Sequence, residues 1–166
     1  GVKNRDRGEP TRTMLSRRDL DGVECVTLVD EKIKWTEGMN SNGIAIISSS
    51  LSAERTGVAK HPARNRVFIR TALEQPSVER AVNALKGKVT GCVMVFDKDE
   101  MWLVEGTDKG RRQEIHRITS DSVARTNHGI WIPEAGYQSD HPDHILAMRR
   151  VGSEARFLIA KHVLGT

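Results

Sequence analysis

Aromatic residues are scarce in this chain of 166 residues, which has three Phe, three Trp and one Tyr. Proteins that hold single-stranded nucleic acid stack its bases on several aromatic side chains, and this sequence offers few of them. The net charge is +4, and the Lys and Arg residues are spread along the chain. A solvated surface therefore explains the basic balance better than a groove for nucleic acid.

Cysteine and long apolar runs are also scarce. The two cysteines, Cys25 and Cys92, each lie within an apolar run, and no Cys-x-x-Cys pair is present. We therefore expect two buried free thiols in a cytoplasmic protein, with no structural zinc site. No apolar run approaches the ~20 residues that a membrane-spanning helix requires, and no signal peptide is visible. Because the first residue is Gly1 and not Met, we expect the encoded protein to include residues before it.

The order of apolar and polar segments predicts an α+β fold in one domain over residues 1–166. Residues 1–22 are polar and predict the end of a strand followed by an exposed loop, with a turn at Asp21-Gly22. Further strands are expected over residues 23–29, 32–35, 44–51, 89–96, 101–105, 111–118 and 122–126. Antiparallel hairpins with separate helices fit a two-layer fold, and also a four-layer sandwich in which two sheets lie between helix layers.

Helices are expected over residues 65–75, over a segment that follows Pro76-Ser77, and from Ser153 onwards, where Ser153 would cap the N-terminus of the last helix. Two of them have apolar stripes at helical spacing, which are typical of helices that pack on a core. The first stripe comprises Val78, Ala81, Val82 and Leu85, and the second comprises Ala155, Leu158, Ile159, His162 and Val163.

The stretch from Trp35 to Ser50 combines a turn rich in Gly and Asn with an apolar strand. Gly38 and Gly43 can adopt a positive φ, which such turns need. The β-branched run that follows predicts a strand buried on both faces, and three serines end it. Taken alone, the stretch indicates a hairpin turn before a core strand.

Four short segments resemble, in the same order, the site segments of one protein family. These segments are Val2–Asp6, Gly38–Ile44, Thr126-Asn127 and Ser153–Phe157. The family is that of the N-terminal nucleophile hydrolases that cleave linear amides, which includes choloylglycine hydrolase, acid ceramidase and penicillin acyltransferase. The Gly-Met-Asn-x-x-Gly motif at Gly38–Gly43 is the most specific of the four. The resemblance implies an αββα sandwich with antiparallel sheets, hydrolysis of amide C–N bonds or acyl transfer, and autoprocessing.

The resemblance also implies functions for individual residues. Asp6 would hold the terminal amine that serves as the general base, and Asn127 would donate a hydrogen bond to the oxyanion. Arg156 would favour the thiolate form of the nucleophile. Lys3 stands where the family has Arg, and Ser50 stands where choloylglycine hydrolases have a second oxyanion Asn. The nucleophile, expected to be Cys, would precede Gly1.

Two further residues are candidates for contact with the substrate, which would be a small-molecule or peptide amide. Asn40 belongs to the glycine-rich turn, and His128 directly follows Asn127. No cofactor is expected. The segment from Asp140 to His144 contains acids and imidazoles that could bind a metal, but a polar loop explains the pattern better.

The residues leave other functions open. Asp6 could form a surface salt bridge with Arg5 or Arg7, Asn127 could be a turn residue, and Arg156 could be a solvated helix residue. The chain could then be an inactive relative that acts as a binding module, or a basic domain that binds nucleic acid. The sequence also leaves the oligomeric state open, including a homo-oligomer.

Overall fold

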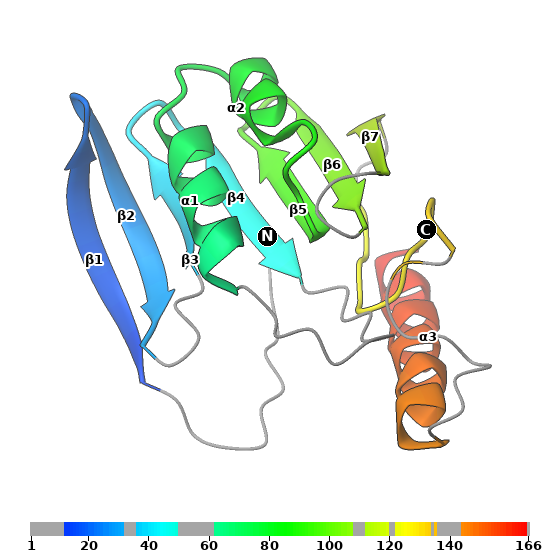
Figure 1. Ribbon diagram of the computed structural model, residues 1–166. Helices are drawn as coiled ribbons and strands as arrows, with labels where there is room; N and C mark the ends of the chain where they lie inside the picture. Colours follow the sequence, from blue (N-terminus) through cyan, green and yellow to red (C-terminus); the bar gives the residue numbers. More distant parts are fainter. Residues whose placement is uncertain are drawn as a thin grey trace.

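The computed structural model describes residues 12–31, 36–49, 62–107, 112–119, 122–133, 135 and 144–165. Over these residues the chain forms one seven-stranded sheet and three helices, with every strand antiparallel to its neighbour. This arrangement confirms the predicted α+β class. Figure 1 shows the sheet fanning out from β1 at one edge to β7 at the other.

The strands follow one another in the sheet in the order of the sequence, so the sheet is a meander. They are β1 (Thr13–Leu20), β2 (Val23–Asp30), β3 (Thr36–Asn40), β4 (Ala45–Ser49), β5 (Gly91–Phe96), β6 (Met101–Gly106) and β7 (Gln113–Ile118). The predicted strand over residues 32–35 lies outside the described residues.

The hairpin of β1 and β2 turns where the sequence predicts it. Asp21 has a φ of 52° and Gly22 a φ of 83°, and two consecutive positive φ values are what a two-residue hairpin turn requires. The Asp19 carboxylate accepts the Gly22 N–H at 2.8 Å. The predicted exposed loop before this turn is wrong over Thr13–Leu20, because cross-strand pairing with β2 makes this polar segment an edge strand.

Helices α1 (Pro62–Leu73) and α2 (Val78–Leu85) connect β4 to β5. The predicted stripe of α2 is confirmed, because all four of its apolar residues are buried. The Ser77 hydroxyl accepts the Arg80 N–H as the N-cap, and Gly87 follows the C-cap with a φ of 69°. Helix α1 begins three residues earlier than predicted, at Pro62, since proline is tolerated in the first turn of a helix.

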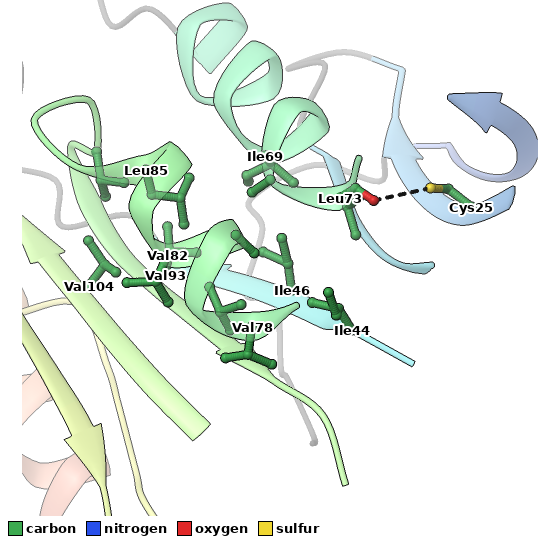
Figure 2. Packing of buried hydrophobic residues seen from close by; sticks show 14 of the residues in the cluster. Cys25, Ile44, Ile46, Ile69, Leu73, Val78, Val82, Leu85, Val93 and Val104 are labelled. Atoms are coloured by element: carbon green, nitrogen blue, oxygen red, sulfur yellow. Dashed lines mark hydrogen bonds between the residues drawn. The ribbon is translucent and has the colours of Figure 1, made fainter. Parts of the chain in front are cut away.

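The main core lies between these two helices and one face of the sheet (Figures 1 and 2). Ile46, Val93 and Val104 from the sheet, together with Ile44 just before β4, pack there with the buried residues of α1 and α2. The Cys25 thiol also lies in this core and contacts the Leu73 carbonyl oxygen at 3.7 Å. Burial raises the pKa of that thiol. Cys25 and Cys92 are both buried and neither forms a disulfide, which confirms the prediction of two buried thiols.

The opposite face of the sheet carries a small second cluster, and over β1–β3 it presents exposed apolar side chains beside charged ones such as Arg17 and Glu37. Cys92, Leu103, Ile132 and Ala135 form the cluster under β5 and β6. Leu15, Val26, Leu28 and Met39 share this face on β1–β3, because Leu15 pairs with Leu28 and Val26 pairs with Met39. Leu15 is 72% exposed and Met39 is 53% exposed. We call these four residues the bare sheet face.

Helix α3 (His144–Leu164) lies away from α1 and α2, beside the segment of residues 122–133 (Figure 1). Its predicted start at Ser153 is wrong, because Ser153 lies in the middle of the helix. The predicted strand over residues 122–126 is also wrong, since this segment is irregular. The apolar stripe of α3 faces outward, with Leu158 at 65% and Val163 at 76% exposure. No helix among the described residues combines the length and apolarity needed to cross a membrane.

Asn40 ties the turn between β3 and β4 to the end of α1. Its side-chain Nδ2 donates to the carbonyl oxygens of Leu73 and Gln75 at 2.9 and 3.0 Å. Its Oδ1 accepts the N–H groups of Asn42 and Ile44 at 3.0 and 2.9 Å. The whole hydrogen-bonding capacity of this buried amide is therefore used within the protein.

We predict that Asn40→Ala lowers the free energy of unfolding by about 2–4 kcal/mol, because it leaves several buried backbone groups without partners. Asn42→Ala is the matched control, since Asn42 is exposed and contacts the same Gln75 oxygen at only 3.5 Å. Urea unfolding of the two variants measures the difference. An Asn40→Ala variant as stable as the Asn42→Ala control would contradict the anchoring function of Asn40.

Candidate functional site

Three of the predicted site residues lie together, and a fourth lies elsewhere. Asn127, His128 and Arg156 meet where the segment of residues 122–133 packs on α3. Asn40 does not join them, because it faces α1 on the opposite side of the sheet. The predicted contact of Asn40 with substrate is therefore not part of this site. Lys3, Asp6 and Ser50 lie outside the described residues.

One face of α3 holds the Asn127-His128 dipeptide. Ser153, Arg156 and Phe157 stand at positions i, i+3 and i+4, which lie on the same side of a helix. Ser153 contacts both residues of the dipeptide, Arg156 contacts Asn127, and Phe157 contacts His128. The spacing of the Ser-x-x-Arg-Phe motif thus has a geometric explanation, because each side chain reaches the same pair of residues.

The Ser153 hydroxyl is fully buried, with 0% exposure of the residue, and it lies between two groups of the dipeptide. It accepts the Asn127 backbone N–H at 2.8 Å. It also lies 2.9 Å from Nδ1 of His128, which in turn lies 3.0 Å from the Thr126 hydroxyl. The Phe157 ring meets the His128 ring edge-on, with the centroids 5.5 Å apart. His128 is therefore fixed by two hydroxyls and one aromatic ring.

Arg156 contacts the side-chain oxygen of Asn127. Its Nη2 donates to Asn127 Oδ1 at 3.3 Å. A guanidinium group has only donors, so the atom that faces it must be the amide oxygen. The Asn127 –NH2 group is consequently turned away from Arg156.

The end of β4 reaches the same place from the sheet. Ser49 donates a long hydrogen bond of 3.4 Å to the Thr126 carbonyl oxygen. Ser49 pairs with Cys92 on β5 and shares its face of the sheet, which is the face opposite α1 and α2. The site thus combines β4, the 122–133 segment and α3, which are far apart in the sequence.

The Glu105 carboxylate holds the continuation of this segment against β6. Glu105 is fully buried, and its oxygens accept the N–H groups of Ile130, Trp131 and Ile132 at 2.8–3.1 Å. The chain curls tightly here, because a Cβ at Gly129 would lie 2.0 Å from the Ile132 oxygen. A buried charge with three backbone donors is well satisfied, so Glu105 is the anchor of the segment.

A second group of polar side chains surrounds Trp131. The His116 ring stacks on Trp131 at a centroid distance of 4.0 Å, and the Arg125 guanidinium lies 4.1 Å from the same indole. Burial lowers the pKa of Arg125, while the nearby Cys92 and Glu105 oppose this shift. These contacts keep the indole and the guanidinium next to the second core cluster.

Burial also lowers the pKa of His128 from its ordinary value of 6.5. The positive charge of Arg150 adds to this effect, as do Arg125 and Arg156, and only Glu154 opposes it. The imidazole is 4% exposed, and a charged ring there would lose its hydration. His128 is therefore neutral at pH 7.

From the sequence we predict only helix capping for Ser153 and no function for Glu105. Both residues nevertheless have features in the sequence that indicate buried contacts. An acidic residue inside an otherwise apolar strand needs buried partners, and a Ser three residues before an Arg lies on the same helix face. Thr126 is predicted only as part of the Thr-Asn dipeptide and not as a contact of His128, which its hydroxyl touches.

Among the described residues, no group of three or more His, Cys, Asp or Glu side chains could hold a metal ion. Of the metal alternative from Asp140 to His144, only His144, the first residue of α3, is among the described residues. Comparison with protein-family models, with curated proteins and with solved structures finds no match to this chain.

We predict that Glu105→Gln lowers the free energy of unfolding by about 1.5–3 kcal/mol, the magnitude of hydrogen bonds to a charged group. The amide presents one acceptor oxygen and one donor –NH2, so backbone N–H groups lose an acceptor. Glu114→Gln on the paired position of β7 is the control, because that side chain is 41% exposed. Chemical denaturation of both variants tests the prediction, and equal effects would contradict the anchor.

We predict that His128 makes folding stability pH-dependent below pH 6.5. The pKa of His128 is lower in the folded state than its ordinary value of 6.5, so the unfolded chain binds the proton first as the pH falls. Stability should be unaffected by this group above pH 6.5 and decrease between pH 6.5 and the lowered pKa. The difference in urea midpoint between wild type and His128→Gln, measured from pH 8 to pH 5, isolates the contribution. A constant difference would contradict it.

Proposed function

We propose that this chain belongs to an N-terminal nucleophile hydrolase that cleaves linear amide C–N bonds. In this proposal Asn127 donates its side-chain N–H to the oxyanion of the tetrahedral intermediate. The nucleophile is a Cys that precedes Gly1 and whose own α-amino group is the general base. The substrate is a small-molecule or peptide amide, and water or a second amine accepts the acyl group.

The orientation of the Asn127 amide is the observation that carries this proposal. An oxyanion donor must present its N–H before the charge develops, since only a preorganised donor stabilises the transition state more than the ground state. The contact with Arg156 at 3.3 Å holds the oxygen and directs the –NH2 group away.

The charge around the site supports the same chemistry. Arg125, Arg150 and Arg156 all act on His128, against one acidic group, Glu154. A positive environment favours a thiolate nucleophile and an oxyanion. The neutral His128 adds no charge of its own and is held too firmly to act as a mobile base, in agreement with a mechanism in which the terminal amine takes the proton.

Two apolar surfaces support the four-layer architecture. The bare sheet face lies opposite α1 and α2, and the apolar stripe of α3 is exposed as well. Large exposed apolar patches usually mark surfaces that another element covers. In the proposed αββα sandwich, a second sheet packs on the first one and carries the second helix layer, so it would cover both surfaces.

We predict that Asn127→Ala lowers kcat for amide hydrolysis by roughly 10²–10³, the loss typical of removing one oxyanion donor. Asn127→Asp should lose as much, because it keeps an oxygen for Arg156 but has no N–H to donate. Both variants should unfold at nearly the wild-type urea concentration. The assay uses the full protein, whose first residue is checked by mass spectrometry, and a panel of N-acyl amides and peptides.

Two results would contradict the proposal. One is a mature protein that begins with a nucleophilic residue and turns over none of these amides. The other is wild-type activity in Asn127→Asp. Saturable binding of amides without turnover, measured by calorimetry, would instead favour the inactive binding module.

A further inference from the structure

We propose that Ser153 is the positioning residue of the site, and that one hydrogen-bond chain from Asn127 N–H through the Ser153 hydroxyl to His128 Nδ1 fixes the oxyanion donor. This inference rests on the proposed function for its catalytic consequence. Its structural part, the chain of hydrogen bonds, stands on the two distances of 2.8 and 2.9 Å.

The direction of the first hydrogen bond follows from the chemistry of its groups, and the direction of the second is part of the proposal. The Asn127 backbone N–H can only donate, so the Ser153 oxygen accepts it. A hydroxyl has a single proton, and in the proposed chain the Ser153 proton is donated to His128 Nδ1 at 2.9 Å, while the Thr126 hydroxyl lies 3.0 Å from the same nitrogen. When Nδ1 accepts that proton, the Ser153 lone pairs remain directed towards Asn127. Each bond then polarises the next one, which strengthens the chain.

The chain requires a neutral imidazole with its proton on Nε2. An imidazolium ring would carry a proton on Nδ1 and could not accept from Ser153. The cations Arg125, Arg150 and Arg156 surround His128 together with Glu154, and the ring is buried. Both conditions disfavour the charged form, so the surroundings of His128 maintain the acceptor that Ser153 needs.

Ser153 and Arg156 act on different parts of Asn127. Ser153 holds its backbone, and Arg156 holds its side-chain oxygen. The backbone contact places the Cα atom from which the donor amide extends. A displacement of about 1 Å at a reacting group can reduce the rate by roughly 10²-fold, so the backbone contact contributes to catalysis without touching the substrate.

Ser153→Ala and Thr126→Val separate this chain from general packing. Ser153→Ala removes the acceptor of the Asn127 N–H and the partner of His128. Thr126→Val, which has nearly the same shape as threonine, removes only the second hydroxyl at Nδ1. We expect hydrogen exchange of the Asn127 amide to accelerate by roughly tenfold in Ser153→Ala, because one hydrogen bond is lost. It should stay within about twofold in Thr126→Val, with core amides such as Val93 unchanged in both.

The ¹⁵N chemical shift of His128 tests the second bond. In the wild type, Nδ1 should have the shift of an unprotonated ring nitrogen at pH 7.5, and the protonated nitrogen should be Nε2. In Ser153→Ala the two tautomers should both be populated. A protonated Nδ1 in the wild type would overturn the proposed direction of the chain.

Enzyme kinetics test the catalytic part of the proposal. Ser153→Ala should lower kcat by roughly 10–100-fold with little change in KM. Unchanged exchange of the Asn127 amide in a folded Ser153→Ala variant would overturn the positioning function. If the wild type has no amidase activity but the exchange and ¹⁵N results hold, the proposed function fails and the hydrogen-bond chain stands.

Ser153→Cys keeps the test decisive if Ser153→Ala does not fold. The sulfur atom is a weaker acceptor of nearly the same size. Hydrogen exchange of the Asn127 amide should therefore be faster than in the wild type but slower than expected for Ser153→Ala. Wild-type exchange rates in Ser153→Cys, together with wild-type kcat, would contradict the inference.

Discussion

The buried carboxylate of Glu105 is the constraint on which the site depends. It accepts three backbone N–H groups from Ile130–Ile132 and thereby fixes an irregular segment against β6. An irregular segment cannot satisfy its own backbone in the way that a helix or a strand does. One side chain from the sheet supplies the acceptors instead, and this allows Ile132 and Ala135 to complete the second core cluster. The dipeptide Asn127-His128 lies just before the residues that Glu105 holds, so the same contacts also restrict where the dipeptide can lie.

The two faces of the sheet are stabilised in different ways. On the face under α1 and α2, helix periodicity and strand alternation bury a continuous apolar core, and Asn40 joins the β3–β4 turn to α1 through backbone acceptors. On the other face, a carboxylate, a hydroxyl and a guanidinium hold the chain. A densely packed apolar core specifies a fold and offers no reactive group, whereas the polar face presents donors in fixed orientations.

Local physics made the first face predictable and the second one largely not. The stripe of α2 and the turn at Asp21-Gly22 follow from periods and backbone preferences that act within a few residues. Residues Thr13–Leu20 are polar, and only pairing with β2 makes them a strand. Serine is a residue type that often caps helices, but Ser153 lies inside α3. Its buried hydroxyl accepts a hydrogen bond from Asn127, which is far away in the sequence. The motif predicts Asn40 as a site residue, whereas its four hydrogen bonds within the chain anchor the β3–β4 turn to the end of α1.

The site residues that the structure does bring together share one geometric principle. Ser153 and Arg156 are one helical turn apart, so a single rigid element holds both the backbone and the side-chain oxygen of Asn127. Two contacts from one helix fix a position and an orientation together, and they cannot drift relative to each other as contacts from two loops could. Phe157, on the same helix face, holds the ring of His128 in the same way. The Ser-x-x-Arg-Phe spacing therefore places three side chains against the Asn127-His128 dipeptide, and the position of Asn127 depends on that of α3.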